Sequence, residues 1–335
     1  MKKIKQVLAL LLAAILLLTG CGAASKSNYG STVAATYGDR TIYLDEANFW
    51  LRAAEVSYST YVSLYAQYYG VDFWSAESGR RLQTYAESLR EDVMAEFRQI
   101  NILLDHASEY PTDLSDAELA KIEAAIAEMK EGYGEALFSE TVIGNYSDES
   151  LKQSLINRTK ALKVWQGVRN QATVSVPEDE CKSFTLKYFR MNDTTSATVG
   201  EETITGEAIA DLLETALNEG KSFEELTNTY NTLYFDTQSF LRNDQDDSSM
   251  LFTTGQYMQD GQIRKFTDNT NSTPIYYVVL CVSADDPVAA QNARAEMESE
   301  QREDYFEKIF EEWQKAAKSF SVKSAFTSLP LPGGN

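Results

Sequence analysis

The strongest constraint on the fold is a strand pattern that interrupts a run of long helices. In SFTLKYFRMN, residues 183–192, the apolar residues Phe184, Leu186 and Tyr188 fall on one face, and the polar residues between them fall on the other. This period of two is typical of a half-buried β-strand, whereas the flanking sequence has the three- and four-residue steps of helices. The chain must therefore contain a sheet as well as a helical part.

Amphipathic helices are predicted on both sides of this strand. An aromatic-rich helix is expected at 45–69, and a longer one at 79–108. The segment 115–118 has the Ser-x-x-Glu pattern of a capping box at a helix start. Further helices are expected after Ser147 and at 289–320. The apolar face of the helix at 79–108 is formed by Leu82, Tyr85, Leu89, Val93, Phe97, Ile100, Leu104 and Ala107.

The section from 183 to 286 mixes strands and helices. Its first strand is followed by a helix around 207–217, a capping-box helix that starts at 222–225, and a final strand at 274–282. This order is an α+β pattern. A long helix resumes after Pro287, so the mixed section interrupts a helical domain. The predicted fold class is mainly α with an inserted α+β module.

Two short strand-like pieces lie at the two ends of the helical part. Residues 32–36 precede the turn at 37–40, and residues 321–323 follow the last helix. If one domain is built from both parts of the chain, 32–36 and 321–325 lie side by side as a small sheet. The last helix then packs against the helices near the N-terminus.

The first residues predict export. Three lysines precede an apolar run at 7–18, which has the length of a signal-peptide core and is too short to span a bilayer comfortably. The run ends in LTGC, residues 18–21, which resembles the bacterial lipobox. That resemblance implies a lipoprotein signal peptide at 1–20 and a diacylglycerol group on Cys21. Residues 21–31 are expected to form a flexible tether, because they are rich in Gly, Ala and Ser.

Composition excludes several classes of function. The chain has 30 basic and 50 acidic residues, and without residues 1–20, which hold three lysines and no acid, the net charge becomes −23. Such an acidic surface argues against nucleic acid as a partner and against a polybasic contact with anionic lipid. Membrane attachment is therefore expected through the N-terminal lipid alone.

Cysteine and histidine are too scarce for several kinds of chemistry. His106 is the only histidine and is expected on the polar side of its helix, so neither a zinc site nor a His-based triad can be assembled within this chain. No metal and no cofactor are expected. Cys181 and Cys281 are either free thiols or one disulfide, and the sequence does not decide between these states.

The order of these parts resembles the PrsA and SurA group of extracytoplasmic foldases. VAATYGDRTI at 33–42 is similar to the opening strand and turn of that group, and LSDAE at 114–118 resembles its repeated helix start. Within the mixed section, NEGKSFEEL at 218–226 looks like the second-helix segment of parvulins. DGQI at 260–263 resembles the turn before the last parvulin strand.

The resemblance implies a domain organisation and a function. Residues 32–178 would form the first part of a helical chaperone domain, 288–328 would complete it, and 182–286 would be a parvulin-like domain. The implied protein is anchored to the outer face of the bacterial cell membrane. It would hold unfolded or newly exported polypeptides in an aromatic, Met-containing cradle between helices.

The predicted parvulin-like domain lacks the two histidines that parvulins carry. Parvulins carry one histidine in the first strand and one in the last, and Tyr188 and Tyr277 occupy those positions here. An isomerase lowers a rotational barrier of about 20 kcal/mol by cradling a twisted imide, which needs no proton transfer. The two tyrosines either retain some of that hydrogen bonding or pack as cross-strand partners. No catalytic residue is assigned.

Four residues are candidates for binding peptide, namely Met250, Phe252, Tyr257 and Met258, which would line a remnant proline groove. Their spacing is also typical of core residues. The predicted function is that of a membrane-anchored chaperone with an inactive parvulin-like domain. An active peptidyl-prolyl cis-trans isomerase is the first alternative. A solute-binding lipoprotein is the second, and it is disfavoured because the sequence lacks repeated βαβ periodicity.

Overall fold

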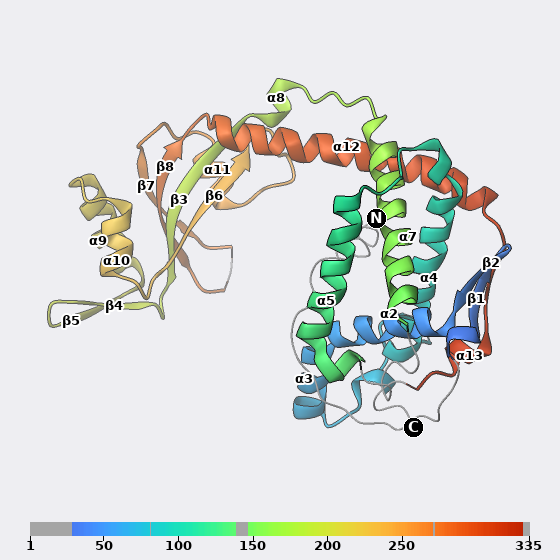
Figure 1. The fold of residues 1–335 in the computed structure, drawn as a ribbon. Coiled ribbons are helices and arrows are strands. Elements are labelled where there is room, and N and C mark those ends of the chain that lie inside the picture. The colour runs from blue at the N-terminus through green and yellow to red at the C-terminus, as the bar shows by residue number, and fades with distance from the viewer. Residues whose placement is uncertain (1–28, 81, 139–146, 271, 331–335) are drawn as a thin grey trace. The chain divides into compact units, whose positions relative to one another are not determined.

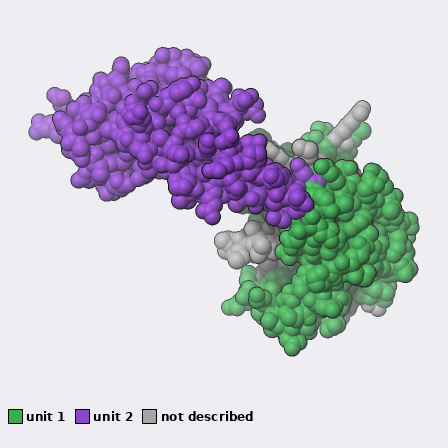
Figure 2. All heavy atoms as spheres, turned by 90° about the horizontal axis from the view of Figure 1, so that it is seen from above, with its two compact units in different colours: residues 1–171, 305–335 green, residues 172–304 purple. Residues whose placement is uncertain are grey.

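The computed structural model describes residues 29–80, 82–138, 147–270 and 272–330. The chain divides into two compact units, Met1–Gln171 with Tyr305–Asn335 and Ala172–Asp304, coloured green and purple in Figure 2. The predicted signal peptide, Cys21 and residues 21–28 of the predicted tether lie outside the described residues. Within the described ranges, no helix is long and apolar enough to cross a membrane.

Unit 1 contains a small antiparallel sheet built from both ends of the chain. Its strands are β1 (Val33–Tyr37), β2 (Arg40–Tyr43) and β9 (Phe320–Val322), in the order β2-β1-β9. Ala35 pairs with Val322, which confirms the predicted pairing of the two short strands. The turn between β1 and β2 places Gly38 at a φ of 57°, a conformation that favours glycine.

The first described residues, 29–31, belong to the predicted tether. Tyr29–Ser31 form the short helix η1, and the ring of Tyr29 is buried against the core of unit 1. The tether prediction, which extended to residue 31, was therefore too long by three residues. The large apolar ring explains the difference, because its burial fixes a segment whose composition is otherwise that of a linker.

Five long helices make up most of the described part of unit 1, and three short ones accompany them besides η1. In Figure 1, α4, α5 and α7 run alongside one another, and α2 crosses them. The long helices are α2 (Leu44–Ser57), α3 (Ser59–Tyr69), α4 (Tyr85–Asp105), α5 (Asp116–Phe138) and α7 (Asp148–Asn170). The short ones are η2 (Phe73–Ser75), η3 (Ala107–Glu109) and α13 (Ser324–Thr327).

Two predicted helix boundaries were wrong. The helix expected at 45–69 is broken at Tyr58, whose ψ of 1° is not helical and whose ring packs against Phe73 and Trp74. The helix expected from residue 79 starts at Tyr85, because Thr84 and Glu87 form a capping box there. Leu82, assigned to the apolar face of that helix, lies outside it with a φ of 62° and is 93% exposed.

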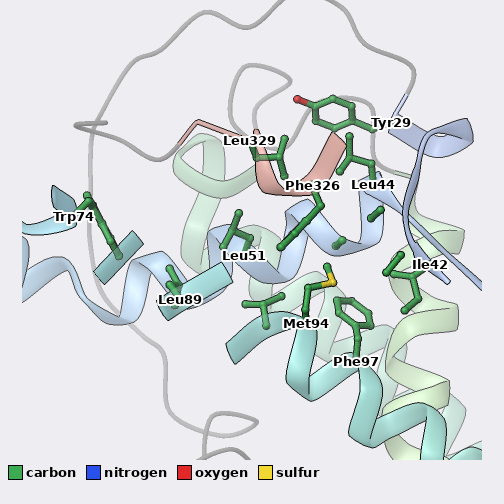
Figure 3. Packing of buried hydrophobic residues seen from close by; sticks show 14 of the residues in the cluster. Tyr29, Ile42, Leu44, Leu51, Trp74, Leu89, Met94, Phe97, Phe326 and Leu329 are labelled. Carbon is green, nitrogen blue, oxygen red and sulfur yellow. The ribbon is translucent and has the colours of Figure 1, made fainter. Parts of the chain in front are cut away.

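The core of unit 1 lies between α2, α4, the small sheet and the C-terminal segment. Figure 3 shows Leu44 and Leu51 of α2 packed with Met94 and Phe97 of α4 and with Phe326 of α13. A second cluster is completed by the end of α12 (Pro287–Ala316). Its buried members are Tyr37, Ile102, Val164, Val168, Phe306 and Phe310. The C-terminal helix therefore packs against the N-terminal part of the chain, as predicted.

Unit 2 is built on a four-stranded antiparallel sheet with the strand order β6-β3-β8-β7. The helices α9 and α10 lie on one side of the sheet and α11 lies on the other (Figure 1). The strands are β3 (Ser183–Asn192), β6 (Tyr234–Leu241), β7 (Ile263–Asp268) and β8 (Ile275–Ser283), with a separate hairpin of β4 (Ser196–Val199) and β5 (Glu202–Thr205). The helices are α8 (Glu178–Cys181), α9 (Gly206–Asn218), α10 (Phe223–Thr229) and α11 (Met250–Gly255).

The strand β3 has the two faces that its sequence predicts. Phe184, Leu186 and Tyr188 pack on the α11 side, while Lys187 points to the other side and pairs with Glu224 of α10 at 2.6 Å. Residues of β3 are buried on both faces, because helices cover both. The fold class, mainly α with an inserted α+β module, is confirmed.

Candidate functional site

An aromatic groove in unit 1 is the first candidate site. It has a volume of about 530 Å³ and lies between the end of α2, α3, η2 and the first half of α4. Its lining comprises five aromatic rings, three aliphatic side chains, Ser57 and two acids. These are Tyr58, Tyr61, Tyr65, Phe73 and Tyr85, then Ala54, Leu89 and Val93, and finally Asp92 and Glu96.

The helix α3 presents its aromatic residues to solvent. Its sequence, STYVSLYAQYY, contains no charged residue, and none of its side chains is buried. Tyr61 is 57% exposed, and Leu64, Tyr68 and Tyr69 are exposed as well. An apolar surface of this kind on a soluble protein marks a site of interaction.

Phe73 holds the rings of the groove in place. Its ring is buried, lies 4.2 Å from that of Tyr85 in a stacked arrangement, and meets Tyr65 edge to face at 5.1 Å. Asp72 caps the short helix that carries Phe73 by accepting a hydrogen bond from the backbone N–H of Trp74. The aromatic surface is thus formed before any ligand arrives, which lowers the entropic cost of binding.

The two acids of the groove are paired with arginines. Asp92 accepts two hydrogen bonds from Nη2 of Arg80, at 2.7 and 2.8 Å. Glu96 forms an ion pair with Arg158, whose guanidinium carbon lies 3.7 Å from the centre of the Trp50 ring. Each carboxylate of the lining therefore has a cationic partner.

The hydroxyls of Tyr58 and Tyr65 stay protonated near neutral pH. Burial, followed by the charge of Asp92, raises the pKa of Tyr58, and the charge of Arg80 opposes this shift. The hydrogen bond with Tyr85 raises the pKa of Tyr65. The groove therefore offers neutral rings and hydroxyls, which suit apolar contacts and occasional hydrogen bonds.

The sequence indicated an aromatic cradle but not its residues. A signal was present, since Tyr58, Tyr61 and Tyr65 follow one another at steps of three and four within an uncharged segment. The expected methionine is not part of the lining. Met94 of α4 points instead into the core between α2 and α4, as Figure 3 shows.

The tyrosine pair of unit 2 is the second candidate site. The rings of Tyr188 and Tyr277 lie 6.0 Å apart, so the structure brings these two predicted residues together. They belong to a row of four rings, one from each strand of the sheet. In sheet order these are Tyr234, Tyr188, Tyr277 and Phe266, with successive centroid distances of 6.4, 6.0 and 5.0 Å.

The chemistry of Tyr188 is that of a packed ring. Its side chain is only 6% exposed, and burial, followed by the nearby Tyr234, Asp236 and Tyr277, raises the pKa of its hydroxyl far above the usual value. Tyr234 donates a hydrogen bond to Asp236 at 3.2 Å. Tyr188 therefore stays neutral near pH 7, and its surroundings fit the packing interpretation better than a catalytic one.

The four candidates for a proline groove do not lie on one surface. Phe252 and Met258 are buried in the core on the α11 side of the sheet. Met250 and Tyr257 are exposed, Tyr257 to 74%. Within and just after the six-residue helix α11, the buried residues are Leu251, Phe252, Gly255 and Met258, and the exposed ones are Met250, Thr253 and Tyr257. A common groove formed by all four residues is therefore absent from the described structure.

His106 and the two internal cysteines have structural surroundings. His106 was expected on an exposed polar face, but it ends α4, stacks on Trp313 at 3.8 Å, and places Nδ1 2.6 Å from Glu109 Oε1. Cys181 and Cys281 are both free and buried. Burial raises the pKa of the Cys281 thiol, which makes this thiol a weak nucleophile.

Neither a protein-family model nor a curated protein matches the chain. Solved structures with similarity include the foldase protein PrsA from Streptococcus pneumoniae, with 14% identity, 73% of this chain and 93% of that chain covered, and a TM-score of 0.36. The PrsA foldase from Lactococcus lactis has 12% identity, coverages of 88% and 96%, and a TM-score of 0.34.

A third similar structure comes from work on two SurA-like chaperones of Campylobacter jejuni, with 11% identity, coverages of 88% and 100%, and a TM-score of 0.30. These proteins belong to the group that the sequence resembles, as predicted. Their function does not transfer to this chain at such identities and TM-scores.

Proposed function

We propose that this chain is an extracytoplasmic, lipid-anchored chaperone of the foldase type, which holds unfolded or newly exported polypeptides. The observation that carries this proposal is the groove of unit 1, with five aromatic rings beside a helix that buries none of its side chains. A soluble protein keeps such a surface when a partner covers it. Polypeptides with exposed apolar side chains are partners of that kind.

The groove suits loose and sequence-tolerant binding. Tyrosine rings offer a large apolar area with few rotatable bonds, and their hydroxyls can bond to peptide groups of any sequence. Ser57 adds one more hydroxyl. Because the lining has no unpaired charge, contacts depend on the apolar content of the client and not on a particular motif.

The proposed membrane anchor is a lipid attached to Cys21. A lipid on this residue would leave eight residues before Tyr29, which is already packed in unit 1. Eight extended residues reach about 27 Å at about 3.4 Å each. Unit 1 would then stay near the membrane surface, where exported chains emerge.

The anchor is tested by the substitution Cys21→Ser. We expect the variant to move from the membrane fraction to the soluble fraction or to remain unprocessed. Unchanged partitioning into detergent would show that the lipobox interpretation is wrong, without bearing on the groove.

The domain at 182–286 is proposed to be parvulin-like and without isomerase activity. The packing of Tyr188 and Tyr277 supports this. An active isomerase is the alternative, favoured by the row of rings across the sheet and by the polar pair of Tyr234 and Asp236 beside it. The solute-binding alternative is disfavoured, since every strand pair in the described part of the chain is antiparallel.

The client-binding proposal is tested by aggregation of an unfolded protein. The mature chain with Cys21→Ser is added to a chemically unfolded client, and light scattering is followed after dilution. We expect Tyr61→Ser with Tyr65→Ser to abolish most of the protection while melting like the parent. Tyr43→Ser, which removes an exposed ring of unit 1 outside the groove lining, is the control. Full protection by a folded Tyr61/Tyr65 variant would overturn the proposal.

A further inference from the structure

The charges around the aromatic groove point to a determinant of client selectivity. We propose that Arg80 masks Asp92, so that the groove selects apolar, uncharged segments and does not favour basic ones. This inference rests on the proposed client-binding function. It assigns to Arg80, which lies outside the lining, the role of a specificity-determining residue.

The geometry of the pair supports this role. One nitrogen of Arg80, Nη2, lies 2.7 and 2.8 Å from the two oxygens of Asp92, and the groove-lining Tyr58 is affected by both charges. At Tyr58 the carboxylate raises the pKa of the hydroxyl and the guanidinium lowers it. The two charges therefore act at the aromatic wall in opposite directions.

Masking matters because the rest of the protein is strongly acidic. The chain has a net charge of −20, which attracts basic segments over distances of about 10 Å at ordinary salt. A bare carboxylate within the groove would add a local contact for lysine or arginine to this general attraction. With the carboxylate masked, retention in the groove depends on apolar contact, which salt does not screen.

The second acid of the groove is masked in a different way. Arg158 is 4% exposed, pairs with Glu96, and lies over the ring of Trp50. Loss of Arg158 would leave a poorly solvated carboxylate and disturb folding. The pair of Arg80 and Asp92 is partly exposed, and exposed ion pairs contribute little to stability. The Arg80–Asp92 pair can therefore be changed without loss of the fold.

The test uses three fluorescent peptides with the same aromatic core and with lysine, glutamine or glutamate flanks. Their affinities for the mature chain with Cys21→Ser are measured by fluorescence anisotropy in 50 mM and 500 mM NaCl. The variants are Arg80→Gln, Asp92→Asn and their combination. Lys152→Gln is the control, because it also removes one positive charge from unit 1, where Lys152 pairs with Glu123 at 2.6 Å, outside the groove lining.

We expect Arg80→Gln to raise the affinity ratio of the lysine peptide to the glutamine peptide by up to about five-fold in 50 mM NaCl, and little in 500 mM. Asp92→Asn should raise the ratio of the glutamate peptide to the glutamine peptide. The combined variant should return both ratios toward those of the parent, and the remaining difference would come from Glu91, the second partner of Arg80 at 3.8 Å. Lys152→Gln should leave them nearly unchanged.

Two results would contradict the proposals in different ways. Equal shifts in Arg80→Gln and Lys152→Gln would mean that only net charge matters, which overturns the role of Arg80 and leaves client binding intact. Failure of the parent chain to bind any of the three peptides would overturn the proposed function and this inference together.

Discussion

The two units each contain a cluster of aromatic rings, and the clusters differ in what supports them. In unit 1 the rings of the groove lie on and around α3, a helix with no buried side chain. In unit 2 the rings of Tyr188 and its neighbours lie on a sheet whose strands they join. Aromatic content alone therefore does not identify a binding surface. The exposure of the individual rings also matters, since Tyr61 is 57% exposed and Tyr188 only 6%.

The difference follows from the geometry of the two kinds of element. Neighbouring strands place side chains about 5 Å apart, so the four rings pack side by side, and Tyr188 inside the row is buried while Tyr234 at the sheet edge stays exposed. Helix α3 packs on the core through Val62 and Tyr65, and it leaves three tyrosines exposed, Tyr61, Tyr68 and Tyr69. The same residue type thus stabilises unit 2 and remains available for binding in unit 1.

The prediction with the largest expected effect compares two deletions. One removes part of the core of unit 1, and the other removes the row of rings in unit 2. Ending the chain at Asp286 removes Phe306 and Phe310, which are buried in the core of unit 1. Burial of one large apolar side chain contributes about 1.5–3 kcal/mol, and a domain is stable by only about 5–15 kcal/mol. We expect this truncation to aggregate and to lose protection of clients.

Excision of the module is the matched deletion. Joining residues 181 and 287 by a short Gly/Ser linker removes the row of rings in unit 2 but none of the groove. Loop closure costs little here, because it grows slowly with length. The remainder should melt cooperatively and still protect clients. The predicted discontinuous domain would be wrong if the excised form is unfolded while the truncated form melts cooperatively.

A second expected effect compares single rings from the two clusters. Tyr188→Ala should lower the free energy of unfolding by about 3–5 kcal/mol, because it leaves a cavity beside Tyr277. Tyr61→Ala should change it by no more than about 0.5 kcal/mol, because Tyr61 is largely exposed. Urea unfolding measures both. Comparable losses in the two variants would remove the distinction between a packed row and an open groove.

The sequence predicted those features that depend on local pattern. The strand within 183–192 was found because Phe184, Leu186 and Tyr188 alternate with polar residues, although it was expected to be half-buried and both faces of β3 are covered. The helix starts at 115–118 and 222–225 were found because Ser and Glu at this spacing hydrogen-bond within one turn. Each of these signals lies within a few neighbouring residues, so it can be recognised without knowledge of contacts to distant parts of the sequence.

Other features depend on contacts that carry no periodic signal. The strand β6 was not predicted, since six of its eight residues are exposed and no alternation results. The break at Tyr58 depends on Phe73 and Trp74, which approach it only in the folded unit. The pairing of Arg80 with Asp92 spans a turn and the start of a helix, so neither residue predicts the other.

A third prediction concerns catalysis by the row of rings. If Tyr188 and Tyr277 only pack, the mature chain should not accelerate prolyl isomerisation in peptides with any residue before proline. The double variant Tyr188→Phe, Tyr277→Phe should give the same result, because it keeps both rings. A clear rate in the parent that disappears in the double variant would restore the enzyme, and the sheet of unit 2 would then carry a site as well.

The prediction with the smallest expected effect concerns unit 2, whose free energy of unfolding should fall at alkaline pH. The folded-state pKa of Tyr188 is raised, mainly by burial, above the value of about 10 that an unfolded chain would have. Because the folded-state pKa is raised, the neutral hydroxyl contributes fully to the free energy of unfolding below pH 10. This contribution falls as the pH rises from 10 toward the folded-state pKa.

The phenylalanine of the Tyr188→Phe variant cannot ionise. The variant's free energy of unfolding should therefore decline less than that of the parent between pH 10 and pH 11.5, as measured by urea unfolding. The same decline in the Tyr188 variant and the parent would mean that the Tyr188 hydroxyl is not held in a dry, packed site, and the contrast between the two aromatic clusters would lose its electrostatic support.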